Sequence, residues 1–374
     1  MAGLMVVVLV GLGWSIGTAL LAPGGDSVAA KLAEWGRDHG LGAAVGWMET
    51  AQYDLHPPQE GGSVSVPQIG KAAGAGTAAG SASSQAPGAS GGSVKVVQPI
   101  VPGPVTSPAG PNLPSEGVWQ SIESVNGTPA MYATFVRPDT THTSYLAGIV
   151  SMDQRLVKFQ LHPGETDPGP GAWGVPTSVP PTDRANLLAT FNGGFKVKDS
   201  RGGFYLNGQT AGTLTNGAAS LVFGKDGHVT VGVWGRDVTM TPDVGAVRQN
   251  LKLIVDHGKV PANVDSNVEA NWGASISGNL YVWRSAMGLT ADGRLIFVYG
   301  PALSVRSVAD LLQRSGVVTG LQMEINPAWM SFMYYQQTAD PTTPTPVNLL
   351  SSQERPADRY LQPTSRDFIQ ASTR

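Results

Sequence analysis

The chain has 374 residues, with 24 Lys and Arg against 27 Asp and Glu, and it contains no cysteine. A net charge of −3 excludes a broadly basic nucleic-acid-binding protein, so no nucleic-acid partner is expected. The lack of cysteine excludes disulfides, thiolate metal sites and cysteine nucleophiles.

Residues 1–22 contain no charged side chain. About twenty apolar residues are enough to cross a bilayer. A cleavable signal peptide would begin with a basic region, which this stretch lacks. We therefore predict an uncleaved transmembrane anchor, which makes the membrane a partner of the chain. The protein would then be a single-pass protein of the cell membrane, with its main domain outside the cytoplasm. The alternative is a buried core helix.

Two further segments separate this stretch from the main domain. Residues 23–56 are predicted to form an amphipathic helix, because Val28, Leu32 and Trp35 give an apolar stripe after a start signal at Ser27. Beside an anchor, such a helix is expected at the membrane surface, with core packing as the alternative. Residues 57–114 are rich in Pro, Gly, Ser and Ala, a composition typical of a flexible linker.

Residues 115–374 have the pattern of a single α+β domain. Short β-branched and aromatic segments predict strands, and Asp226-Gly227 and Asp292-Gly293 each lie between two alternating runs, as in a hairpin. The fold class that we predict is a mixed, mostly antiparallel sheet with a few packing helices, preceded by the transmembrane helix and the linker.

One helix and the strand after it are predicted in more detail. Ser307 and Asp310 have the spacing of a capping box, and Gly316 suits the end of the helix. A buried strand follows and is expected to end at Glu324. An acid at such a position is costly unless it is paired or solvated at a cleft.

Four polar clusters lie at the ends of predicted strands. They are Asn192 with Lys196, Tyr205 with Asn207, Arg284 with Ser285, and Glu324 with Asn326. Each alone has a structural explanation; Asn207-Gly208, for example, is typical of a turn. Together they supply cations, amides and a carboxylate, so we expect them to converge on one site. The six histidines show no metal-binding spacing, so neither a metal site nor a cofactor is predicted.

The glycine pair Gly193-Gly194 belongs to the first of these clusters. Glycine pairs are costly to order, so the backbone there is expected to turn tightly or to approach a ligand closely. Asp256 is a possible second carboxylate, although a turn at the end of a strand explains it about as well.

Three segments together resemble the phosphodiester glycosidase family. They are ATFNGGF at 189–195, WRSAMGLTADGRLIFVYG at 283–300, and SVADLLQRSGVVTGLQMEINP at 307–327. The form resembles a membrane-anchored, actinobacterial-type branch. Many members end the last strand in Leu-Asp-Gly-Gly-Gly-Ser. Here the acid is Glu324, one methylene longer, and the glycine loop is absent.

The resemblance implies a hydrolase that cleaves the C1–O bond of a sugar phosphodiester in a cell-wall or exopolysaccharide polymer. The transition state would be oxocarbenium-like. Glu324 is then expected to act as base, nucleophile or electrostatic stabiliser, and Arg284 to bind the phosphate through its planar fork. Asn192 completes the expected catalytic set. The expected substrate-binding residues are Lys196, Gly193, Gly194, Tyr205, Asn207, Ser285, Asn326 and Asp256.

Two alternatives remain open at the level of sequence. The first is a non-catalytic module that binds wall glycans through the same cleft and through exposed tryptophans such as Trp272 and Trp329. The second is a phosphodiesterase that breaks the P–O bond, a reaction that usually recruits metal ions.

Overall fold

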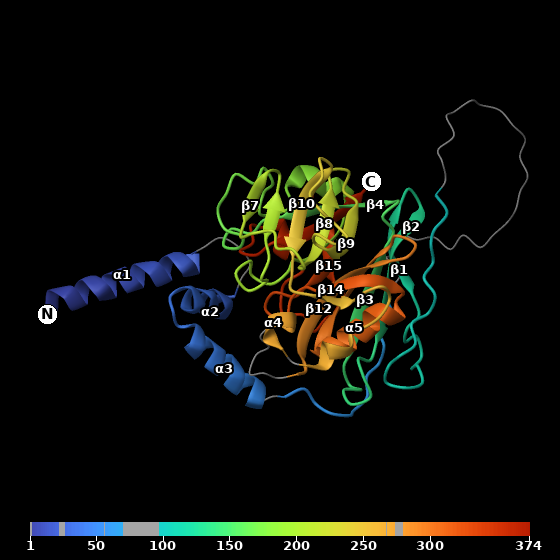
Figure 1. Cartoon of the computed structure of the whole chain (residues 1–374), viewed down its shortest axis with the longest axis horizontal. Coiled ribbons are helices and arrows are strands. Elements are labelled where there is room, and N and C mark those ends of the chain that lie inside the picture. Colours follow the sequence, from blue (N-terminus) through green and yellow to red (C-terminus); the bar gives the residue numbers. More distant parts are fainter. Residues whose placement is uncertain (1, 22–26, 56, 70–96, 267, 274–279) are drawn as a thin grey trace, which may run out of the picture.

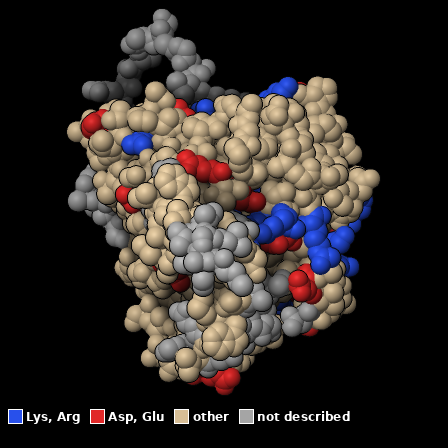
Figure 2. Space-filling view, turned by 90° about the vertical axis from the view of Figure 1, so that its left-hand side faces the viewer, with Lys and Arg blue, Asp and Glu red and all other residues tan. Residues whose placement is uncertain are grey.

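A computed structural model describes residues 2–21, 27–55, 57–69, 97–266, 268–273 and 280–374. Figure 1 shows three helices on one side of a body built mainly of β-sheet. These helices are α1 (Ala2–Leu21), α2 (Val28–Asp38) and α3 (Gly42–Leu55). The face that carries them, seen in Figure 2, is mostly uncharged, with basic and acidic side chains close to one another.

The largest sheet has seven strands in the order β1-β2-β3-β13-β12-β14-β11, all paired antiparallel. In that order they are Gln120–Val125, Thr128–Val136, Ala147–Met152, Leu295–Leu303, Val282–Thr290, Val317–Gln322 and Leu253–Val255. Helix α5 (Val305–Arg314) packs on β12, β13 and β14.

Two five-stranded antiparallel sheets complete the body. The second sheet is β7 (Gln209–Ala211), β6 (Phe204–Leu206), β10 (Val244–Gln249), β8 (Ala219–Gly224) and β9 (Val229–Val233). The third sheet is β16 (Thr345–Asn348), β15 (Phe332–Gln336), β5 (Leu187–Asn192), β17 (Phe368–Thr373) and β4 (Val157–His162). The short helices are η1 (Pro181–Asn186), η2 (Ala262–Asp265), α4 (Glu269–Trp272) and η4 (Arg359–Leu361).

The main core is built from residues of all three sheets. Phe191 of β5 stacks on Phe332 of β15 at 5.6 Å between ring centroids, and lies 4.9 Å from Phe297 of β13. Each buried ring stabilises the fold by roughly 1.5–3 kcal/mol relative to an exposed one. This packing holds the end of β5 close to the strands of the central sheet.

The predicted hairpins are confirmed. Asp226-Gly227 lies between β8 and β9, which pair antiparallel, and Asp292-Gly293 lies between β12 and β13. Gly227 and Gly293 have φ of +81° and +84°, a backbone conformation that glycine adopts without a steric cost.

Helix α5 is confirmed, but it begins earlier than predicted. The N-cap is Ser304, whose side chain accepts from the N–H of Ser307 at 3.0 Å, while the Ser307 hydroxyl accepts from the N–H of Ser304 at 2.8 Å. A serine pair therefore forms the capping box that we had assigned to Ser307 and Asp310. Gly316, with φ of +86°, follows the end of the helix as predicted.

The predicted transmembrane helix is wrong. Residues 2–21 do form α1, but no helix in the part of the chain that the structure describes is long and apolar enough to span a bilayer. The predicted single-pass location in the cell membrane depended on this span and is withdrawn with it.

The segment predicted as one amphipathic helix forms two. Ser27 caps α2 as expected, accepting from the N–H of Ala30 at 3.2 Å. Gly40, with φ of +80°, then separates α2 from α3.

Parts of the predicted linker contact the sheets. Val105 is buried, and the N–H of Gln59 donates to the Tyr145 hydroxyl at 3.0 Å. Residues 70–96, which include most of the low-complexity stretch, lie outside the described residues.

Candidate active site

Glu324 lies just past the end of β14, where the chain leaves the central sheet. Backbone bonds to Ser285 of β12 hold it there: the N–H of Ser285 donates to the Glu324 carbonyl at 2.8 Å. The chain then turns, and the N–H groups of Ile325 and Asn326 donate to Oε1 of Glu324 at 2.8 and 3.2 Å. The carboxylate is therefore fixed by its own turn and is almost completely buried.

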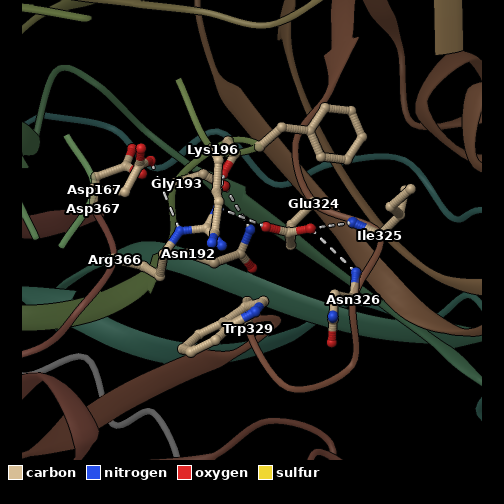
Figure 3. A network of polar contacts seen from close by, with 12 residues as sticks. Asp167, Asn192, Gly193, Lys196, Glu324, Ile325, Asn326, Trp329, Arg366 and Asp367 are labelled. Atoms are coloured by element: carbon tan, nitrogen blue, oxygen red, sulfur yellow. Dashed lines mark hydrogen bonds and ion pairs between the residues drawn. The ribbon is translucent and has the colours of Figure 1, made fainter. Parts of the chain in front are cut away.

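Arg366 is the cation that faces this carboxylate. Its Nη2 lies 3.1 Å from Oε2 of Glu324 and also donates to the Gly194 carbonyl at 3.1 Å. Arg366 lies two residues before β17, and β17 pairs with β5, so the sheet register brings it beside the Asn-Gly-Gly turn. Figure 3 shows it between Glu324 and the acids Asp167 and Asp367.

Asn192 and Ser285 meet next to Glu324. Nδ2 of Asn192 donates to Oγ of Ser285 at 3.0 Å, and that hydroxyl accepts from the N–H of Glu324 at 3.1 Å. Oδ1 of Asn192 accepts from the N–H of Ser331 at 3.2 Å. The structure thus brings these two predicted site residues to Glu324, where they position its backbone.

The glycine pair forms a tight turn, the first of the two predicted alternatives, and the atoms packed against its backbone belong to the protein. A Cβ on Gly193 would lie 2.0 Å from Oδ2 of Asp367, and one on Gly194 would lie 3.3 Å from the Arg248 guanidinium. Asp367 and Arg248 form a buried ion pair at 2.8 Å. The N–H of Gly193 donates to the Asp367 carbonyl at 3.1 Å. The turn is tight because this ion pair packs directly against its backbone.

Lys196 completes the cationic side of the site and has an unexpected partner. It forms an ion pair with Glu34 of helix α2. Oε1 of Glu34 also lies 3.8 Å from Nη1 of Arg366, and Oδ2 of Asp167 lies 3.8 Å from Nε of the same arginine. Two cations therefore share three carboxylates, Glu324, Glu34 and Asp167, in a nearly dry environment.

Burial dominates the electrostatics of this cluster. It raises the pKa of Glu324 above its ordinary value, although Arg366 and the two backbone amides lower it in part. For Arg366, burial lowers the pKa, but Glu324, Asp167 and Glu34 together raise it above the ordinary value. Burial likewise raises the pKa of Asp367, against the influence of Arg248. The arginine therefore stays charged while the Glu324 carboxyl is held closer to neutrality.

Two hollows adjoin the cluster. A cavity of about 600 Å³ is lined by Asn326 and Trp329 on the side of the sheets, and by Ala30 and Ala33 of α2 on the other. A second, of about 380 Å³, is lined among others by Asp167 and Lys196. Lys196 and Asp167 are therefore open to a small molecule from the second cavity, whereas the first reaches the turn that follows Glu324.

Arg284 does not belong to this cluster, contrary to the prediction. Its Nε donates to the Leu303 carbonyl at 2.9 Å, Nη1 to Oε1 of Gln322 at 2.8 Å and Nη2 to the Leu280 carbonyl at 3.3 Å. Adjacent residues of a strand point to opposite faces. Because Ser285 points to Glu324, Arg284 must point away from it. These bonds join β12 to the backbone of Leu280 and Leu303 and to the side chain of Gln322.

Three other predicted residues are bound elsewhere. Asp256 belongs to a surface network with Arg236, at 2.8 Å, and His257. Tyr205 packs beside the small cluster of Trp234 and its neighbours on the second sheet. Asn207 has φ of +49° at the turn between β6 and β7 and donates to the Trp173 carbonyl at 3.0 Å. It is therefore a turn residue, the structural explanation given for Asn207-Gly208 in the sequence.

Asn326 has a divided role. Its N–H binds Glu324, while Oδ1 accepts from the N–H of Ala328 at 2.9 Å in an Asx turn. It also lines the larger cavity.

The two tryptophans expected to be exposed are both buried, at 4% each. Trp272 packs in the core beneath α5. Trp329 lies against the guanidinium groups of Arg355, Arg359 and Arg366, at 4.7, 5.5 and 5.4 Å from its ring centroid. Such stacking orients Arg366 toward Glu324, and Figure 3 shows the indole beside it.

Four charged residues of the cluster were not predicted from the sequence: Arg366, Asp367, Asp167 and Glu34. The Arg-Asp pair directly before the final apolar strand has the same signature, a charge at the end of a strand, that drew attention to Glu324. Nothing in the local sequence around Glu34 distinguishes it from a solvated helix residue.

No three His, Asp or Glu side chains among the described residues are placed to share a metal ion. The polar groups of the site are instead suited to binding an anion beside a carboxylate.

Comparison with known proteins adds little. No protein-family model and no curated protein matches the chain. The structure is similar to the zebrafish N-acetylglucosamine-1-phosphodiester alpha-N-acetylglucosaminidase catalytic domain, auto-inhibited by pro-peptide. The TM-score is 0.43 at 14% identity, covering 68% of this chain and 87% of that one.

Two further structures show weaker likeness. A hypothetical protein from Synechocystis gives a TM-score of 0.36 at 12% identity, covering 69% of this chain and 65% of that one. A putative exported protein from Burkholderia pseudomallei gives 0.28 at 12%, covering 61% and 74%. At these TM-scores and identities the likeness does not indicate an activity for this chain.

Proposed function

We propose that this chain is a hydrolase that cleaves the C1–O bond of a sugar phosphodiester, with Glu324 as its reacting carboxylate. The observation that carries the proposal is the geometry of that carboxylate: two backbone amides fix Oε1, and Arg366 contacts Oε2 at 3.1 Å. The cell-wall or exopolysaccharide polymer that would contain the sugar phosphate stays a prediction from the sequence.

Arg366 and Lys196 are the groups that we propose for the phosphate, in place of Arg284. Both are nearly buried and both lie beside the Glu34 carboxylate, so a phosphate in its place would replace one anion by another next to these two cations. The planar fork of arginine suits phosphate oxygens. We call Lys196 and Arg366 the anion subsite.

The proposed reaction needs little beyond these groups. As the C1–O bond breaks, the bonding electrons move to the phosphate oxygen and positive charge develops at C1. The anion subsite stabilises the leaving phosphate, and Glu324 faces the developing charge or accepts a proton from the attacking water. Water supplies the new hydroxyl at C1, and the other product is a phosphate monoester.

The binding-module alternative loses its main support with the burial of Trp272 and Trp329, since exposed aromatic faces were its expected contact surface. The choice between C1–O and P–O cleavage depends on where the oxygen of water ends up, which an isotope experiment decides.

The test is hydrolysis of a generic sugar phosphodiester in oxygen-18 water, read by mass spectrometry of both products. We expect the label on the sugar and none on the phosphate. Label on the phosphate would show P–O cleavage and overturn the assignment, and a lack of turnover with a panel of sugar phosphodiesters would count against any hydrolase.

A further inference from the structure

Helix α2 places one carboxylate inside the proposed site. Glu34 contacts both members of the anion subsite, Lys196 directly and Arg366 at 3.8 Å. Its side chain is 11% exposed, unusually little for a glutamate, and the two cations are 9% and 6% exposed. The carboxylate therefore occupies the place where an anionic ligand would meet both cations.

The contact is made by charge rather than by fitted hydrogen bonds. Neither oxygen of Glu34 has a hydrogen-bond partner of good geometry. Glu324, by contrast, accepts two backbone N–H groups as well as Arg366. A buried carboxylate held by ion pairs alone is bound less firmly than one that also accepts hydrogen bonds, so Glu34 is the carboxylate that a ligand could displace.

The attachment of α2 to the rest of the chain also permits displacement. Trp35 donates to Oγ of Ser15 at 2.9 Å, and Lys31 to the Leu20 carbonyl at 3.2 Å, so these bonds tie α2 to α1. The cavity of about 600 Å³ lies between α2 and the residues beside Glu324. Moving α2 would open this cavity without breaking a sheet.

We propose that docking of α2 and binding of an anion at Lys196 and Arg366 exclude each other, so that Glu34 holds the site closed until an anionic ligand displaces it. The inference rests on the proposed function in treating these two cations as the anion subsite. If α2 were instead part of the wall of the binding site, its docking would raise the affinity for the anion. Here α2 lowers the apparent affinity by the fraction of molecules in which it is docked.

The experiment measures binding of inorganic phosphate to the full chain by calorimetry, for the wild type, Glu34→Gln and Glu60→Gln. Glutamine keeps the size of the side chain but gives up the charge. We expect Glu34→Gln to bind phosphate about tenfold more tightly, as follows if the undocked form is about one-tenth populated in the wild type and fully populated in the variant. Glu60, exposed in the same N-terminal region, is the charge-matched control, and its variant should bind like the wild type.

A second readout follows the helix itself. Binding and docking are linked, so phosphate should speed hydrogen exchange over residues 28–38 of the wild type. If Glu34→Gln binds phosphate no better than the wild type, or if phosphate slows exchange over α2, the helix is part of the binding wall and the inference is wrong. Should Glu34→Gln fold poorly, Glu34→Asp withdraws the carboxylate by one methylene and should give a smaller gain in affinity.

The outcomes separate this inference from the proposed function. Tighter phosphate binding by Glu34→Gln without turnover of any sugar phosphodiester would support displacement of α2 and reject the hydrolase. Turnover with unchanged phosphate affinity would do the reverse.

Discussion

Two clusters in this molecule pair arginine with carboxylate, but the pKa of the carboxylate shifts in opposite directions in the two. In the buried cluster, Arg366 and Glu324 have side chains that are 6% and 5% exposed. In the surface cluster, Arg236 and Asp256 are 45% and 31% exposed and pair at 2.8 Å. The distances are similar, so the difference between the clusters comes from solvent.

The pKa shifts show the consequence of that difference. The hydrogen bonds from Arg236 lower the pKa of Asp256, because water still solvates the charged form. Burial raises the pKa of Glu324 in spite of Arg366. Burial, and not the pairing with arginine, therefore makes Glu324 the candidate for a reacting carboxylate. A charge at the end of a strand is visible in the sequence, but whether that charge is buried or exposed is not.

The largest effect should come from removing the charge of the buried carboxylate, and the same change in the surface cluster is its control. We expect Glu324→Gln to lower kcat by about 10³-fold or more, in the range seen when a principal electrostatic group is lost. Asp256→Asn should leave kcat within about twofold, since exposed pairs contribute about 0–1 kcal/mol. Steady-state kinetics on a sugar phosphodiester checks both.

Thermal melts accompany these assays. A Glu324→Gln variant that melts like the wild type and keeps its turnover would remove Glu324 from the reaction. Loss of turnover in Asp256→Asn would move the site to the surface cluster.

A smaller effect is expected when an arginine is replaced by lysine, which keeps the charge but lacks the planar guanidinium group. Arg366→Lys should lower kcat/KM by about 10²-fold, because lysine cannot contact Glu324 and a phosphate in the same planar geometry. Arg236→Lys should change it little.

Arg284→Lys is the structural control for this comparison. Arg284 bonds Leu303, Leu280 and Gln322, so this variant should melt earlier, by about 1–3 kcal/mol of stability, with turnover per folded molecule preserved. The reverse result, a normal melt with lost turnover, would restore Arg284 to the site in place of Arg366.

Local signals predicted much of the fold. Asp226-Gly227 and Asp292-Gly293 specified their hairpins because a turn of positive φ needs such residues. The apolar spacing of α5 predicted its buried face, although Ser304 takes the cap. The transmembrane helix predicted from the uncharged N-terminal stretch was wrong, because no helix among the described residues is long and apolar enough to cross a membrane.

The site was harder to predict because its partners are far apart in sequence. Glu324, Asn192 and Ser285 could be named from strand ends, but which face each side chain takes depends on register, and this separated Ser285 from Arg284. Arg366 reaches Glu324 only through the pairing of β17 with β5. Glu34 reaches Lys196 only through the docking of a helix that nothing in its own sequence ties to the site.

The pH dependence of kcat/KM tests the central claim most directly. If the charged form of Glu324 is required, activity is lost as the pH falls through its pKa, which burial has raised. The acid limb should therefore lie above the ordinary range of glutamate, both in the wild type and in Asp256→Asn. A phosphodiester titrates far lower and does not interfere. An acid limb at or below the ordinary glutamate value, or one that moves when Asp256 is replaced, would contradict the assignment of the reacting carboxylate to the buried cluster.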